Sequence, residues 1–179
     1  MLDLLYKTIP EVIKSIDNND TWQGVLINKR QPYTTRIFRD FNGYRVCLHA
    51  FEKCKTDESI PHPHPWPGAF LILDGGYEQE IGFSEDLTSL PKTFIKTVFK
   101  TGSSYEIIEP NIFHKITPLK YTRTISINGP DFEEQHSLVR RTANKNLKEI
   151  PTEDLDKTLF CYKMLLRKFC NMEGILYAG

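Results

Sequence analysis

Three histidines are the residues of this chain best suited to chemistry. Two of them stand in the segment His62-Pro-His64-Pro-Trp66, and the third, His114, lies far along the chain. Side chains alternate along an extended strand, so the imidazoles of His62 and His64 should lie on the same side. An imidazole from a second strand would complete an open metal site, with three nitrogen ligands and free positions for water or substrate. The alternatives are a proline-rich surface turn with incidental histidines and, for His114, a buried hydrogen-bonded side chain.

Short strands separated by turn residues must position these histidines. The run at 69–73 is continuously apolar, which predicts a strand buried on both faces. Turn signals occur at Asn42-Gly43 and Gly75-Gly76, and alternate prolines from 61 to 67 favour an edge or rim strand that needs no ladder donor. Further strands are predicted at 33–38, 44–51, 77–81, 93–99, 104–108, 113–117 and 122–127. Many short strands with Gly and Pro between them are typical of a sandwich or barrel.

Helices are predicted at both ends of the chain. Residues 2–16 carry apolar side chains at helical spacing, with a kink expected at Pro10. Residues 152–173 form a second helix, with Thr152 as its N-cap and Gly174 as its stop. One face of it is apolar, comprising Leu155, Leu159, Tyr162, Leu166 and Phe169. We expect this face to pack on the outside of the sheet or on a partner chain, so a homodimer is compatible with it. The polar stretch 131–150 predicts a connecting loop.

Composition narrows the class of protein. The 179 residues predict one domain, and 23 basic against 23 acidic residues give a formal net charge of +0. That balance gives no reason to expect nucleic acid or an anionic membrane as a partner, and no apolar run is long enough to span a bilayer. The N-terminus lacks a signal peptide pattern, and the four cysteines form no CxxC motif. These features predict a cytoplasmic protein with reduced thiols. No phosphate-binding loop and no GxSxG elbow is present.

The HxH segment, the Gly75-Gly76 turn and the later Pro110-x-x-x-His114 strand resemble the two motifs of the cupin superfamily. Cupins are double-stranded β-helix (jelly-roll) barrels whose two motifs converge on one metal in the barrel mouth. Within the superfamily, the chain resembles more specifically a group of small cupin-like proteins that share an HxHPW element. The similar elements cover about residues 33–130 and are Leu48-His49-Ala50-Phe51, His62–Trp66, Leu71–Glu78, His114 and Thr124–Pro130. The resemblance implies a mainly β cupin barrel at about 25–130, flanked by the two helices, with His62, His64 and His114 as metal ligands.

The chain also departs from the cupin pattern. Cupins usually place a glutamate ligand shortly after the second histidine, where this chain has Pro67, Gly68 and Ala69. Three histidines without a carboxylate resemble the iron site of the thiol dioxygenase branch, which favours iron(II). The same ligands would suit zinc, nickel or manganese. Glu78 or Glu80 is an alternative source of a carboxylate, although exposed glutamates are the norm in strands.

Other polar residues are candidates for the same site. Arg45 and His49 share one face of their strand with Cys47, and this face either lines the barrel mouth or meets solvent. In the first case Arg45 would bind a substrate carboxylate or phosphate, and His49 would act as acid or base. Tyr77 would hydrogen-bond a metal-bound ligand or else pack in the core. Trp66 is expected beside the site, and His136 on the surface.

The first functional hypothesis is a mononuclear metalloenzyme, iron-dependent and oxygen-using like a dioxygenase, acting on a small-molecule substrate. The second is a metal-dependent isomerase or lyase, in which the ion polarises a carbonyl and His49 or Glu78 moves the proton. The third is a non-catalytic module that binds a small ligand or dimerises through its helices. The sequence does not identify the substrate.

Overall fold

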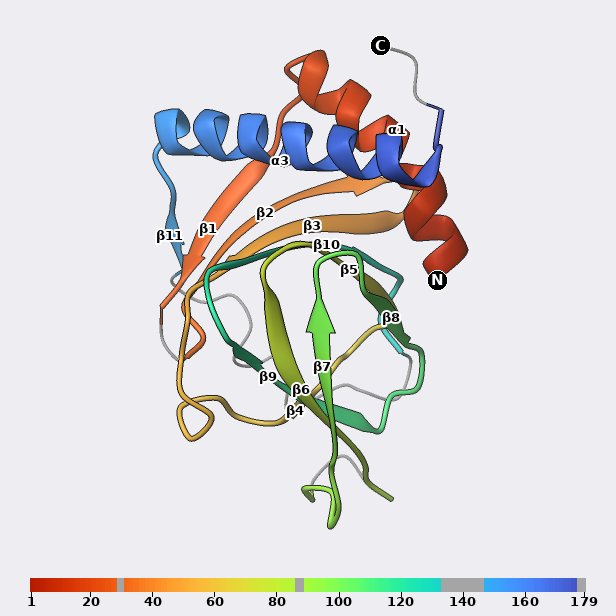
Figure 1. The fold of residues 1–179 in the computed structure, drawn as a ribbon, viewed down its shortest axis with the longest axis vertical. Coiled ribbons are helices and arrows are strands. Elements are labelled where there is room, and N and C mark those ends of the chain that lie inside the picture. The colour runs from red at the N-terminus through yellow and green to blue at the C-terminus, as the bar shows by residue number, and fades with distance from the viewer. Residues whose placement is uncertain (29–30, 86–88, 133–146, 177–179) are drawn as a thin grey trace.

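Two antiparallel sheets form the body of the protein in a computed structural model that describes residues 1–28, 31–85, 89–132 and 147–176 (Figure 1). The larger sheet has the strand order β11-β1-β2-β3-β10-β5-β8. Its strands are β11 (Lys148–Glu149), β1 (Gln23–Ile27), β2 (Thr34–Phe41), β3 (Tyr44–Phe51), β10 (Thr122–Asn128), β5 (Gly68–Asp74) and β8 (Ser104–Ile107). The smaller sheet has the order β4-β9-β6-β7, with β4 (His62–Pro63), β9 (Ile112–Pro118), β6 (Gly76–Phe83) and β7 (Ile95–Lys100).

The strands from β3 to β10 follow jelly-roll connectivity. The order β3-β10-β5-β8 in one sheet faces β4-β9-β6-β7 in the other, so the chain crosses repeatedly between the sheets. This confirms the predicted mainly β jelly-roll architecture with a helix at each end. The β2–β3 hairpin turns at Asn42-Gly43 with positive φ angles of 49° and 84°, as an Asn-Gly turn should. Strand β5 is buried on both faces from Gly68 to Leu73, as its apolar run predicts.

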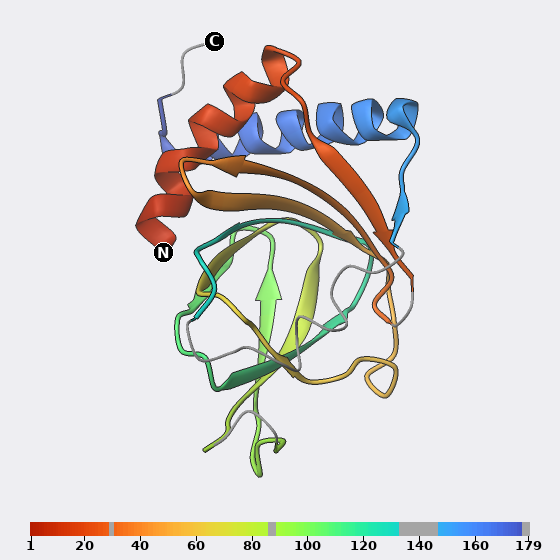
Figure 2. The same cartoon turned by 180° about the vertical axis from the view of Figure 1, so that it is seen from behind.

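The two helices cover the outer face of the larger sheet. Figure 1 and its reverse view, Figure 2, show α1 (Leu2–Asp17) and α3 (Thr152–Glu173) lying over this sheet, away from the barrel interior. The apolar stripes of both helices meet the outward side chains of the strands in one core, which includes Leu5, Ile9, Ile37, Leu48, Leu71, Tyr162 and Leu166. The terminal helices therefore support the barrel wall from outside.

Helix α1 runs through Pro10 as one element, and one detail of the prediction for α3 needs correction. Thr152 is the first helical residue and not the N-cap, because Pro151 occupies the cap position and no side chain caps the helix. Gly174 ends α3 in the left-handed conformation with φ 66°, which confirms the predicted stop. Most of the predicted loop, together with His136, lies outside the described residues.

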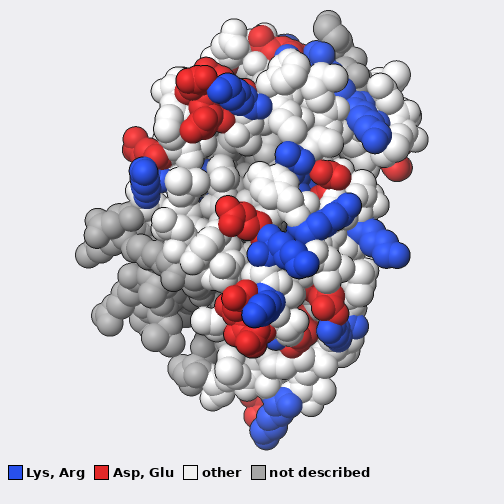
Figure 3. Space-filling model, turned by 60° about the vertical axis from the view of Figure 1, so that its left-hand side comes forward, with Lys and Arg blue, Asp and Glu red and all other residues white. Residues whose placement is uncertain are grey.

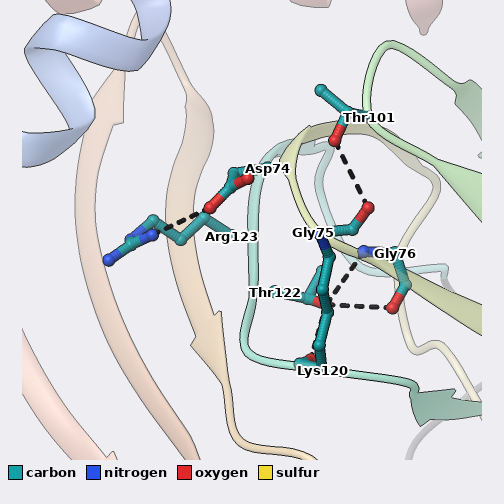
Figure 4. A network of polar contacts seen from close by, with 7 residues as sticks. All are labelled: Asp74, Gly75, Gly76, Thr101, Lys120, Thr122 and Arg123. Carbon is teal, nitrogen blue, oxygen red and sulfur yellow. Dashed lines mark hydrogen bonds and ion pairs between the residues drawn. The ribbon is translucent and has the colours of Figure 1, made fainter.

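The turn between β5 and β6 is held by a network of polar contacts (Figure 4). Gly75 has φ 90°, and an added Cβ would lie 2.6 Å from Thr122 Oγ1. Thr122 Oγ1 accepts the Gly76 amide at 3.0 Å, and its own proton lies within reach of the Gly76 and Lys120 carbonyls. The network fixes where β6 begins, and β6 carries side chains into the barrel.

Charged side chains of both signs are interspersed on the face shown in Figure 3, without a large patch of one sign. Ion pairs between exposed side chains include those of Lys157 with Glu153 and of Arg45 with Asp40. Among the described helices, none has the length and apolar character needed to cross a membrane.

Candidate metal centre

His62, His64 and His114 come together inside the mouth of the barrel. One ring nitrogen of each histidine lies within 4.8 Å of those of the other two. His62 in β4 pairs directly with His114 in β9, and the two rings have centroids 4.8 Å apart. His64 follows β4 and brings its Nε2 to 2.6 Å from His114 Nε2. The strand at the edge of the smaller sheet thus presents its two histidines to the third one on the neighbouring strand.

The Nδ1 atoms of His62 and His114, here called the outer nitrogens, make contacts that suit these histidines to metal binding. His62 Nδ1 lies 3.1 Å from the Ile60 carbonyl oxygen, so Nδ1–H donates and the lone pair of the neutral ring is on Nε2. His114 Nδ1 lies 2.9 Å from the side-chain amide of Gln79. Either end of an amide can face this nitrogen; with Oε1 toward it, Nδ1–H donates and Nε2 keeps its lone pair. Partners of this kind orient ligating histidines in metal proteins.

His64 is also in the protonation state that metal binding requires. Burial, together with the neighbouring charges of His62 and Arg36, lowers the pKa of His64 to about 3. His64 is therefore a neutral imidazole at physiological pH, when a nitrogen lone pair can bind a metal. Its Nδ1 is buried without a hydrogen-bond partner.

Gln79 is a functional residue that the sequence reasoning missed. Its side chain is fully buried and points into the barrel, where it contacts His114. The signal was present, because Gln79 follows the site candidate Tyr77 by two residues, and residues two apart in a strand share a face.

Glu78 and Glu80 point away from the triad. They alternate with Tyr77 and Gln79 along β6 and form ion pairs on the outside of the sheet, Glu78 with Lys96 and Glu80 with Lys115. The alternative in which one of them joins the site is therefore wrong. Phe70 in β5 packs against the triad instead, with its ring centroid 5.4 Å from that of His64. Trp66 lies beside His64, as expected, at 6.3 Å between ring centroids.

His49 lines the same cavity, opposite Arg36. The two residues are paired in the β2–β3 hairpin, and Arg36 Nε donates to His49 Nε2 over 3.0 Å. Burial, with help from the charge of Arg36, holds the pKa of His49 well below its usual value. His49 is therefore neutral and carries its proton on Nδ1. Arg36 was not predicted, although a two-residue turn at Asn42-Gly43 already implies its pairing with His49.

Arg45 and Tyr77 occupy different surroundings. Arg45 is half exposed at the start of β3 and forms a two-point contact with Asp40, which lowers the pKa of that carboxyl. Tyr77 is fully buried, and its hydroxyl lies 2.8 Å from that of Tyr105. Burial raises the pKa of both phenols, so both stay protonated. Tyr77 lines the cavity of the triad, whereas Arg45 lines a second, outer cavity.

Comparison with known proteins finds similar solved structures at low sequence identity. The sequence matches no family model and no curated protein. Among solved structures, the chain is similar to hydroxypropylphosphonic acid epoxidase from S. wedmorenis, with 13% identity, a TM-score of 0.46 and coverage of 59% of this chain and 55% of the epoxidase. A structure of Fe(II)-HppE with an alternative substrate matches at 14% identity, a TM-score of 0.46 and the same coverage. The matched region spans only about half of these chains.

An RmlC-like cupin from Shewanella frigidimarina is also similar. It has 14% identity and a TM-score of 0.45, and the match covers 62% of this chain and 86% of the cupin.

Proposed function

We propose that the protein is a cupin that binds one divalent metal ion through His62, His64 and His114. The single observation that carries this proposal is the convergence of three imidazoles whose ring nitrogens lie within 4.8 Å of one another. The contacts on the outer nitrogens support it, because the Ile60 carbonyl accepts from His62 Nδ1–H and the Gln79 amide orients the ring of His114. Because the three imidazole ligands are neutral, they would not reduce the net positive charge that the ion brings into the cavity.

The reaction proposed for this centre is an oxygen-using oxidation of a small molecule, with iron(II) as the metal. An iron(II) ion supplies the one-electron chemistry with dioxygen that protein side chains lack. The chain's own residues would bind and orient the substrate in the cavity, which measures about 120 Å³ and is lined on one side by aromatic rings. These rings exclude water from that side.

A metal-dependent isomerase or lyase is the second candidate. His49, a proton carrier considered for this reaction, lines the cavity beside the triad, but its Nε2 accepts from Arg36, so this hydrogen bond would have to break before the ring could accept a proton. Glu78, the other proton carrier considered for this reaction, lies on the outside of the sheet. Oxygen consumption during turnover separates the two reactions.

Elemental analysis of the purified protein tests the metal site. We expect about one iron per chain in the parent and none in the double variant His62→Ala/His114→Ala. The matched control is Glu78→Gln/Glu80→Gln, which alters two polar residues of the smaller sheet outside the barrel and should keep the metal. Zinc or nickel at the same level would support the second candidate. Absence of metal after reconstitution with iron(II), zinc, nickel and manganese would contradict both.

A further inference from the structure

Arg36 lies between two adjoining cavities of the barrel and lines both of them. The inner cavity contains the histidine triad, and an outer cavity of about 820 Å³ adjoins it. Four side chains line both: Arg36, His49, His64 and Phe70. A molecule bound in either cavity would therefore lie beside Arg36.

No carboxylate in the described part of the chain forms an ion pair with Arg36. Its only hydrogen bond within the described residues is the one from Nε to His49. By contrast, Arg45 and Arg123 are paired with Asp40 and Asp74. The terminal nitrogens of Arg36 thus keep their donors for a ligand, and a planar guanidinium suits the two oxygens of a carboxylate.

The inner cavity favours an anion for a second reason. Its described lining contains Arg36 and four histidines but no aspartate or glutamate. A divalent ion on three neutral imidazoles would add further positive charge. A small anion would offset this charge in a partly buried place, where opposite charges attract more strongly than in water.

His49 fixes the position of the Arg36 guanidinium. Its side chain is only 7% exposed, and its Nε2 accepts from Arg36 Nε over 3.0 Å. Because this hydrogen bond uses Nε, the two terminal nitrogens of the guanidinium remain the donors that a ligand would meet.

We infer that the natural ligand of this cavity is a small monocarboxylic acid, whose carboxylate pairs with Arg36 and whose other end reaches the histidine triad. This inference extends the proposed function, since it names the substrate class of the same site. His49 acts as a positioning residue that holds the guanidinium through Nε2. The arrangement would exclude neutral molecules of the same shape.

Ligand-observed NMR titration with propionate tests the inference, with propionamide as the neutral molecule of the same shape. Both are titrated into the parent protein, metal-free and metal-loaded. We expect propionate to bind both forms and propionamide to bind at least tenfold more weakly. In Arg36→Met the Kd for propionate should rise at least tenfold, because a charge-assisted hydrogen-bond pair is lost. Arg45→Met, which removes an arginine of the outer cavity already paired with Asp40, should change the Kd less than twofold.

The outcomes separate this inference from the proposed function. Arg36-dependent binding of propionate to a protein that takes up no metal would support the inference and contradict the metal centre. A metal-loaded protein that binds propionate equally well in the parent and Arg36→Met would overturn the inference alone, as would equal binding of propionamide. Tighter binding of ethylphosphonate than of propionate would overturn the assignment of a carboxylate. If Arg36→Met does not fold, Arg36→Lys keeps the charge without the planar fork and should still weaken propionate measurably.

Discussion

The histidine triad depends on a few residues that hold each ring in place. Gln79 and the Ile60 carbonyl oxygen contact the outer nitrogens of His114 and His62, whereas His64 is held by aromatic neighbours. The orientation of the rings therefore comes from two hydrogen bonds and from packing. A single substitution can therefore test how much a given contact contributes to metal binding.

Gln79→Leu should lower metal affinity about 10- to 100-fold, because His114 loses the partner that sets its tautomer. Gln79→Glu is the matched variant: a carboxylate oxygen still accepts from Nδ1–H, so most of the affinity should remain. Competition with a metal-binding dye measures both. Equal affinity in Gln79→Leu and the parent would show that the hydrogen bond to His114 has no part in metal binding.

Phe70→Glu tests how a carboxylate beside the triad would change metal and anion binding. Its ring lies against His64 and His114, so a carboxylate there would reach the triad and add a negative charge. We expect metal affinity to rise and propionate binding to fall, since the added carboxylate repels an anion. Calorimetric titration with the metal, followed by propionate, measures both effects. Phe70→Gln, of similar size but neutral, is the control, and a drop in metal affinity in both variants would indicate disturbed packing instead.

At the scale of elements, the site depends on the placement of three strands. β4 is short and at the edge, β9 pairs with it, and β6 pairs with β9 on its other side. The turn between β5 and β6 sets the start of β6 through Gly75, Gly76 and Thr122 (Figure 4). A shift of β6 by one residue would exchange Gln79 for a glutamate on the barrel side.

Thr122→Val should lower the free energy of unfolding by about 1–3 kcal/mol, because the buried Gly76 amide loses its acceptor. Thr122→Ser keeps the hydroxyl and should cost less. Chemical denaturation with urea measures the difference between the two variants. A Thr122→Val protein as stable as Thr122→Ser would mean that the hydroxyl does not anchor this turn.

At the scale of the whole molecule, the apolar core under the helices is separate from the cavity that holds the histidine triad. The helices and the outer face of the larger sheet form one apolar core, whereas the cavity with the triad lies on the other face of that sheet. Changes in the helix layer should therefore alter stability without altering ligand binding. The homodimer and the small-molecule substrate remain predictions at this scale.

Leu166→Ala in α3 should reduce the free energy of unfolding by about 2–5 kcal/mol, since Leu166 is fully buried in that core. The metal stoichiometry of the folded protein should stay the same. Urea unfolding measures the stability, and elemental analysis of the folded protein measures the metal content per chain. Loss of metal from a folded Leu166→Ala protein would contradict the separation of the two layers.

Much of this arrangement follows from local sequence. The strands at 44–51 and 69–73, the Asn42-Gly43 turn and the helices at 2–16 and 152–173 were predictable, because hydrophobic period and turn chemistry act between near neighbours. The HxH spacing likewise places two imidazoles on one side of an extended segment. The same local rules indicate Arg36 opposite His49 and Gln79 beside Tyr77, although neither was recognised.

The tertiary structure alone decided which residues meet. Only the pairing of β4 with β9 brings His62 onto His114, and only the pairing of β9 with β6 sets Gln79 against that histidine. The placement of Phe70 beside the triad, and of both glutamates outside, depends on which face of each strand turns inward. Sequence sets the two faces of a strand, but the choice between them is made by burial against distant segments, and that choice determined the chemistry of this cavity.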